Sequence, residues 1–142
     1  MAEEQLVVFR LGKEEYALSI SKVRDIIQYK SATKLPNSPA YLKGIINPRG
    51  KLISVIDIAV KFVLDIEEII DRRVIIIDTD DRIFAIIVDE VTEVRKLQDS
   101  DTTSGATNYI RGVAQNGNRL IILLHVEKIV DSATLGLLEN VS

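Results

Sequence analysis

The sequence contains two copies of one pattern, and the second copy follows the first at a constant spacing of 68 residues. Residues 14–26 align with 82–94, and residues 41–58 align with 109–126. Six pairs of identical residues anchor this alignment: Ala17 with Ala85, Val23 with Val91, Tyr41 with Tyr109, Gly44 with Gly112, Leu52 with Leu120, and Ile53 with Ile121. A repeat of this kind predicts two similar structural units, since each copy encodes the same elements.

Each copy has the pattern of several short strands closed by turns. Ile and Val make up 35 of the 142 residues, and these β-branched side chains favour the pleated surface of a sheet. The pattern predicts a mainly β chain that forms a single domain, 1–142, with one small antiparallel barrel from residues 1–70 and another from residues 71–142. This division allows strands near the junction to be exchanged between the two barrels. Units of about 65 residues bury little surface alone, so the barrels should pack together and leave a groove between them.

Two segments of the first copy have helical spacing. Val23, Ile26 and Ile27 lie at positions i, i+3 and i+4, which predicts one or two helical turns. Residues 37–44 predict a second helical turn, which Gly44 would end in a left-handed conformation.

Four other segments complete the assignment. Residues 89–94 predict a turn in the second copy, and Asn116–Gly117 is a strong hairpin signal. Residues 59–71 join the two copies and fit a helix only in part. The last residues, 131–142, predict a short C-terminal helix that packs on one barrel.

Composition excludes several classes of protein. The net charge of −3 lacks the basic excess that phosphate-backbone binding requires, which argues against a nucleic-acid partner. The absence of Cys excludes disulfides, thiolate metal sites and thiol nucleophiles. No apolar run approaches the roughly 18 residues of a membrane span, and the acidic N-terminus does not resemble a signal peptide, so we expect no membrane insertion.

Catalytic signals are also missing. His125 is the only histidine, and no Ser, Cys or carboxylate pattern points to it as a general base. Asp78, Asp80 and Asp81 suggest a turn more than a cation site, because the loop is too short for a calcium loop and Asp is common in turns. We therefore predict a protein that is not an enzyme and has no metal or cofactor.

The segment Asn47–Gly50, "NPRG", raises a separate question. Asn, Pro and Gly at the first, second and fourth positions favour a type I turn, but this does not explain Arg49. The second copy has Gly117 at the aligned position, so Arg49 is an asymmetry between the copies. It is either a solvated turn residue or a contact for a partner, because Arg is favoured at interfaces.

The apolar stripe has the same two interpretations. Val23, Ile26 and Ile27, with Val91 and Val94 in the second copy, are either core residues or the lining of a groove at the junction of the barrels.

The run from Leu35 to Ile58 resembles the most characteristic stretch of the CheW family of bacterial chemotaxis coupling proteins, and residues 84–94 and 109–129 resemble its second half. The resemblance implies two pseudo-symmetric five-stranded Src-homology-type barrels. It also implies a non-catalytic adaptor that links methyl-accepting chemotaxis receptors to the histidine kinase CheA through the kinase's regulatory domain. Such a protein is cytoplasmic, at receptor arrays on the inner face of the bacterial membrane.

The resemblance also implies a receptor-binding groove. Carried over by position, its residues are Val23, Asp25, Gly44, Arg49, Ala85, Val91 and Val94, with Asp25 placed to pair with Arg49. The chain departs from the family pattern at Pro48, where Leu is usual, and Pro48 should stiffen the turn that presents Arg49.

Two alternatives remain at this stage. A small-ligand or oligosaccharide-binding barrel would require exposed aromatic side chains, and the chain has only four Tyr and three Phe. A free-standing kinase regulatory domain would share the fold of the adaptor, although the chain has no ATP-binding segment.

Overall fold

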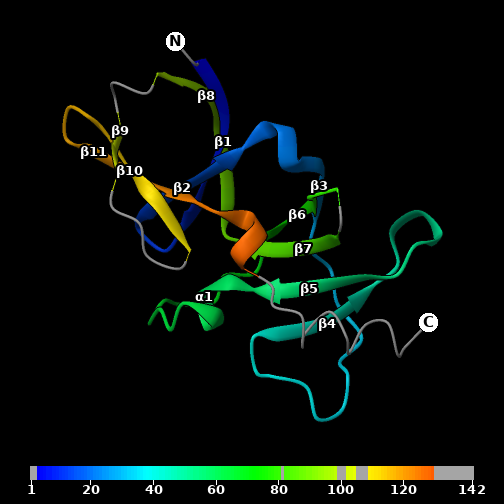
Figure 1. The fold of residues 1–142 in the computed structure, drawn as a ribbon. Coiled ribbons are helices and arrows are strands. Elements are labelled where there is room, and N and C mark those ends of the chain that lie inside the picture. The colour runs from blue at the N-terminus through cyan, green and yellow to red at the C-terminus, as the bar shows by residue number, and fades with distance from the viewer. Residues whose placement is uncertain (1–2, 81, 99–101, 105–108, 130–142) are drawn as a thin grey trace.

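Two β-sheets form the body of the protein (Figure 1). The computed structural model describes residues 3–80, 82–98, 102–104 and 109–129. The first sheet has the order β8-β1-β2-β11-β10-β9, with strands Glu90–Gln98, Glu3–Leu11, Glu14–Ser19, Arg119–Leu124, Ile110–Asn116 and Thr102–Ser104. The second sheet has the order β3-β6-β7-β5-β4, with strands Val23–Gln28, Arg73–Asp78, Ile83–Val88, Ile53–Asp57 and Leu42–Ile46. The prediction of a mainly β fold is confirmed.

Helical structure among the described residues is confined to single turns. They are η1 (Ile20–Lys22), η2 (Pro48–Gly50), α1 (Ile58–Lys61) and η4 (Val126–Lys128). No helix in this part of the chain is long and apolar enough to cross a membrane. The predicted C-terminal helix lies outside the described residues.

The 68-residue repeat is visible in the irregularities of the strand pairing. β3 has one extra residue, Arg24, opposite β6, and β8 has one extra residue, Thr92, opposite β1. β4 and β10 likewise have extra residues at Lys43 and Arg111. Both pairs are 68 residues apart, so the two copies share their β-bulges as well as their strands.

The strands of the two copies are intermingled. Sheet one combines β1 and β2 with β8, β9, β10 and β11, and sheet two combines β6 and β7 with β3, β4 and β5. Each sheet therefore takes strands from both sides of residue 70. Strands of different copies meet twice in each sheet: in an antiparallel pair, β1 with β8 and β3 with β6, and in a parallel pair, β2 with β11 and β5 with β7. The expected antiparallel barrels are therefore corrected in two respects: each sheet contains one parallel pair, and no described pairing closes either sheet.

The predicted helix at Val23, Ile26 and Ile27 is also wrong, since these residues lie on strand β3. The bulge at Arg24 explains the misleading spacing. It places Val23 opposite Ile77 and Ile26 opposite Ile75, so both point to the same face of the strand although they are three residues apart. Residues 90–94 of the predicted turn are part of strand β8, where the extra residue Thr92 has the same effect.

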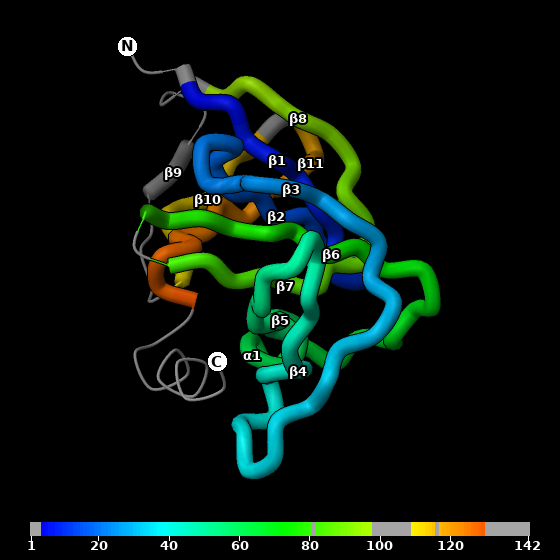
Figure 2. Tube along the Cα trace, turned by 90° about the vertical axis from the view of Figure 1, so that its right-hand side faces the viewer, coloured from blue at the N-terminus to red at the C-terminus, as the bar shows by residue number. Residues whose placement is uncertain are grey.

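Gly44 has a different role from the one predicted. Residues 37–44 form no helix, and Gly44 lies in β4 with φ +148°. A Cβ atom there would lie 2.4 Å from the carbonyl oxygen of Thr33, which pairs with Ile45 across an isolated bridge. Glycine is therefore required for the close approach of two backbones. Figure 2 shows the loop between β3 and β4 projecting beyond sheet two before it returns to this contact.

The hairpin predicted from Asn116–Gly117 is confirmed. Strands β10 and β11 pair from Ile110 to Leu124, and Asn116 is the last paired residue before the turn. The loop is therefore Gly117 and the residue after it, and Gly117 adopts φ +63°.

The main hydrophobic core lies between the two sheets. Its fully buried members from sheet one include Val7 and Phe9, and those from sheet two include Ile75 and Ile77. Leu6 and Val8 on β1 point the other way, into a second cluster on the far face of sheet one. The central strands are buried on both faces, which explains why their sequences are continuous apolar runs.

Candidate functional site

The turn after β4 presents Arg49 to solvent. Lys51 donates its backbone N–H to the Pro48 carbonyl at 3.2 Å, and Arg49 and Gly50 have φ of +55° and +82°. Positive φ at both central residues is the signature of a type I′ turn that starts at Pro48. The predicted type I turn starting at Asn47 is therefore wrong by one residue. Arg49 accepts a left-handed conformation that costs about 1 kcal/mol, and its side chain is 85% exposed.

Asp25 on β3 pairs with Arg49, as predicted. The Arg49 Nη2 lies 3.2 Å from the Asp25 Oδ2, and the other Asp25 oxygen accepts the N–H of Ile26 at 2.9 Å. A hollow of about 330 Å³ adjoins this ion pair, with a floor of aliphatic side chains and a rim of charged ones: Arg24, Asp25, Pro48, Arg49, Lys51, Ile53, Ile76 and Ile83.

A second hollow lies between the edge strands of the two sheets. Ile26 from β3 and Val91 from β8 line a space of about 400 Å³. The other lining residues are Arg10, Ile69, Asp71, Arg73, Asp89 and Glu90. We call this space the inter-sheet groove. The sequence interpretation that the two apolar stripes meet at a junction is thus supported for Ile26 and Val91.

Charged groups around the inter-sheet groove are largely paired with each other. Arg10 forms an ion pair with Glu90, and Arg73 lies 3.5 Å from Asp71. Asp89 is buried and accepts the N–H of Gly12 at 2.8 Å. Because these charged groups already have partners, the aliphatic side chains are the part of this surface that a binding partner would bury.

The other predicted site residues occupy different environments. Val94 is 55% exposed and lies opposite Val7 across the β1–β8 pairing, as Val91 lies opposite Phe9, so both valines face the second sheet. Val23 is half-buried and packs against the central core.

Ala85 is fully buried, at 0% exposure, in the apolar cluster inside sheet two. It lies opposite Val55 in the parallel pair of β5 and β7. Direct contact between Ala85 and a partner is therefore excluded in this structure, as it is for buried Gly44, and both positions contribute to packing.

Six groove residues were not identified from the sequence: Arg10, Ile69, Asp71, Arg73, Asp89 and Glu90. They come from β1, from the segment between the copies, from the start of β6, and from the start of β8 and the residue before it. No local pattern marks them, because only the packing of the two sheets brings these segments together.

Lowered carboxyl pKa values occur away from both hollows, in ion pairs between strands of sheet one that are not adjacent in its strand order. The carboxyl pKa of Glu93 is lowered because it accepts a hydrogen bond from Arg119, which also binds Glu15 at 2.6 Å. The carboxyl pKa of Glu4 is lowered by a hydrogen bond from Arg111. Both shifts result from ion pairs between strands of sheet one, and these ion pairs contribute to the stability of the sheet.

The residues considered for chemistry have structural roles. The N–H of His125 donates to the Tyr109 carbonyl at 2.8 Å, at the position where Asp57 donates to Tyr41 in the first copy. The Asp80 N–H donates to the Asp78 side chain at 3.1 Å, as expected for a turn. Within the described ranges, no group of three His, Cys, Asp or Glu residues could hold a metal ion.

Comparison with known proteins agrees with this architecture. Residues 5–134 match the model of the CheW-like domain. The chain is 32% identical to the chemotaxis protein CheW of Klebsiella aerogenes, with 98% of this chain and 89% of that protein covered, and 30% identical to the CheW of Helicobacter pylori, with 89% and 81% covered. The crystal structure of the scaffolding protein TtCheW from Thermoanaerobacter tengcongensis superposes with a TM-score of 0.85 at 29% identity, over 94% of this chain and 92% of that one. The chain therefore belongs to the CheW family.

Proposed function

We propose that this protein is a non-catalytic chemotaxis adaptor that couples methyl-accepting receptors to the histidine kinase CheA. The observation that carries the proposal is the inter-sheet groove, where repeat-related strands β3 and β8 contribute Ile26 and Val91 to one partly exposed aliphatic surface. An amphipathic helix buries this kind of surface when it lies in a groove. Relatives named as chemotaxis proteins and a scaffolding protein support the same role.

Arg49 is the proposed polar contact for the receptor. Its guanidinium is held by Asp25 but remains highly exposed, so it can donate further hydrogen bonds to a partner. Val23, Val91 and Val94 are the proposed apolar part of the receptor surface. Ala85 and Gly44 would act only indirectly, by keeping sheet two closely packed.

Kinase binding is proposed to use another surface, through the regulatory domain of CheA. The proposal places the protein on the cytoplasmic side of the membrane, at receptor arrays. The proposed function requires no covalent bond to be made or broken. The expected mechanism is that the adaptor binds the receptor and the kinase together and fixes their relative position.

The test compares Arg49→Ala with Lys51→Ala. Both remove one cation from the rim of the same hollow, but only Arg49 is ion-paired with Asp25. In pull-down titrations with a receptor tip fragment and, separately, a CheA regulatory domain, Arg49→Ala should weaken receptor binding more than kinase binding. Lys51→Ala should change neither by more than about twofold. Equal loss of both partners, or of neither, with Arg49→Ala would refute the assignment.

The ligand-binding alternative receives no support from the structure. All seven aromatic side chains are buried or half-buried, and the half-buried ones contact other side chains of the protein. The ring of Tyr41, for example, lies 3.9 Å from the ammonium of Lys61. A platform for sugars would need exposed aromatic rings.

A further inference from the structure

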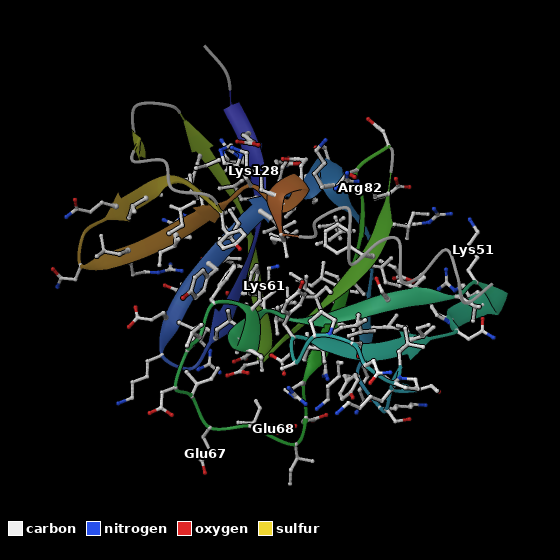
Figure 3. The ribbon with its side chains drawn as sticks, turned by 60° about the horizontal axis from the view of Figure 1, so that its bottom comes forward. Lys51, Lys61, Glu67, Glu68, Arg82 and Lys128 are labelled. Atoms are coloured by element: carbon white, nitrogen blue, oxygen red, sulfur yellow. The ribbon has the colours of Figure 1, made fainter. Side chains whose placement is uncertain are left out.

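The segment that joins the two copies has a surface unlike the rest of the molecule. After α1, residues 63–67 alternate in burial: Leu64 and Ile66 pack against the central core, while Asp65 and Glu67 are exposed, and residues 68–70 are exposed as well. This is the pattern of an extended chain with one face on the protein. We call residues 63–70 the connector strip. Figure 3 shows Glu67 at its outer bend, pointing away from the sheets.

The backbone of the connector strip is unpaired. Among the described residues, no hydrogen bond uses a backbone N–H or C=O of residues 65–70. The neighbouring backbone is engaged, since the N–H of Leu64 donates to Ala59 and the carbonyl of Arg72 accepts from Tyr29. The strip therefore presents free donors and acceptors along an extended edge, which is the template that strand addition requires.

The connector strip is held in place at both ends and in its middle. At its start, the N–H of Val63 donates to the Val60 carbonyl at 3.0 Å, and Val63 adopts φ +58°, a rare conformation for a β-branched residue. At the other end, the buried guanidinium of Arg72 lies 2.7 Å from Glu68 and 3.6 Å from Asp57. In the middle of the strip, Ile66 packs closely on the turn at Gly12. A Cβ atom added to Gly12 would lie 2.8 Å from the Cγ2 of Ile66. A fixed edge loses little entropy on binding.

The exposed side chains indicate what the strip would bind. Val63 and Ile70 are 89% and 98% exposed, the most exposed large apolar side chains described. No Lys or Arg occurs in residues 62–71, whereas four acids do: Asp65, Glu67, Glu68 and Asp71. Glu68 has cationic partners, but no ion pair within the described residues involves Asp65 or Glu67.

We propose that the connector strip is a second docking site, which takes an extended basic segment of another protein by strand addition. Lysine or arginine at alternate positions would lie beside Asp65 and Glu67, and aliphatic residues between them would extend the apolar face formed by Leu64 and Ile66. The strip of a second copy would bring like charges together, so a self-pair is disfavoured. The proposal does not depend on the receptor assignment, because only Ile69 of the connector strip lines the inter-sheet groove and the proposed contacts are made at residues 64–67.

The test titrates the full chain with three capped heptapeptides and follows backbone amides by NMR. The first peptide alternates valine with lysine, the second replaces lysine with glutamate, and the third is the lysine peptide with alternate backbone nitrogens methylated. The lysine peptide should shift the amides of residues 64–68. The glutamate peptide should not bind. The methylated peptide should bind at least tenfold more weakly, since its main chain cannot donate.

A matched pair of variants tests the charge argument. Asp65→Asn with Glu67→Gln should weaken the lysine peptide about fivefold. The control, Asp78→Asn with Asp80→Asn, removes the same charge at the far end of strand β6 and should leave affinity unchanged. Unchanged amide spectra of both free variants would show that they remain folded. Equal binding of the methylated peptide, equal effects of the two double variants, or shifts confined to the groove around Ile26 and Val91 would each overturn the proposal.

Discussion

Gly44→Ala is the substitution for which the structure predicts the largest effect at a predicted site residue. A φ of +148° is open almost only to glycine, and holding alanine there costs about 1–3 kcal/mol. The added Cβ would also lie 2.4 Å from the Thr33 oxygen and 2.7 Å from its carbon. Both atoms are backbone, so the chain must move. The two hydrogen bonds between Thr33 and Ile45, of 2.8 and 2.9 Å, would then weaken, at about 1 kcal/mol each.

The total expected loss is about 3–5 kcal/mol of unfolding free energy, a large share of the roughly 5–15 kcal/mol typical of a domain. Urea denaturation of the full chain at 25 °C, followed by circular dichroism, measures this loss. Gly50→Ala is the control, because Gly50 also has positive φ, +82°, but a Cβ there meets no atom within 4 Å. It should lose only about 1 kcal/mol. If the two variants lost equal stability, the close approach of Thr33 would not be the reason for glycine at position 44.

Three other predictions follow from burial and charge. Ala85→Leu should lower the unfolding free energy by about 1–3 kcal/mol through overpacking, whereas Val94→Ser, at a half-exposed position, should change it by less than about 0.5 kcal/mol; similar urea midpoints would contradict the assigned burial. Phe9→Ala, in the central core, should cost about 3–5 kcal/mol, and a loss below 1 kcal/mol would show that the sheets do not share that core. The pKa of Glu4 lies below its ordinary value of 4.5 because Arg111 donates a hydrogen bond to it. The stability that this ion pair contributes is therefore present above pH 4.5 and is lost as the pH falls through the lowered pKa. Thermal melts of Glu4→Gln should therefore show a shallower decline than wild type from pH 5 to 3; parallel declines would argue against the pair.

The limits of sequence interpretation are clearest on strand β3. The 3.6-residue period of Val23 and Ile26 is real, but a β-bulge at Arg24 produces the same two-residues-on-one-face arrangement as a helical turn. Local propensity cannot separate these cases, because the choice is made by pairing with β6, nearly 50 residues away in sequence. The same bulge occurs in the second copy, where Thr92 of edge strand β8 is the residue equivalent to Arg24.

The candidate site was predictable in part. The pairing of Asp25 with Arg49 followed from the family resemblance, and the ion pair is present. The roles of Gly44 and Ala85 were not predictable in the same way, since one is shaped by the backbone of Thr33 and the other by a parallel strand pair. Both contacts join segments whose proximity depends on the completed fold.

The sequence by itself determined the mainly β class, the 68-residue repeat and the family, because these depend on residue types and spacings that are local or self-similar. Only the tertiary structure decided how the copies combine. The parallel pairs β2–β11 and β5–β7 exchange strands between the halves, and parallel pairing requires a long crossover that leaves no local turn signal. That exchange brings β3 and β8 to one groove. It also leaves the connector strip on the surface, because the strip joins β5 of the first copy to β6 of the second within sheet two.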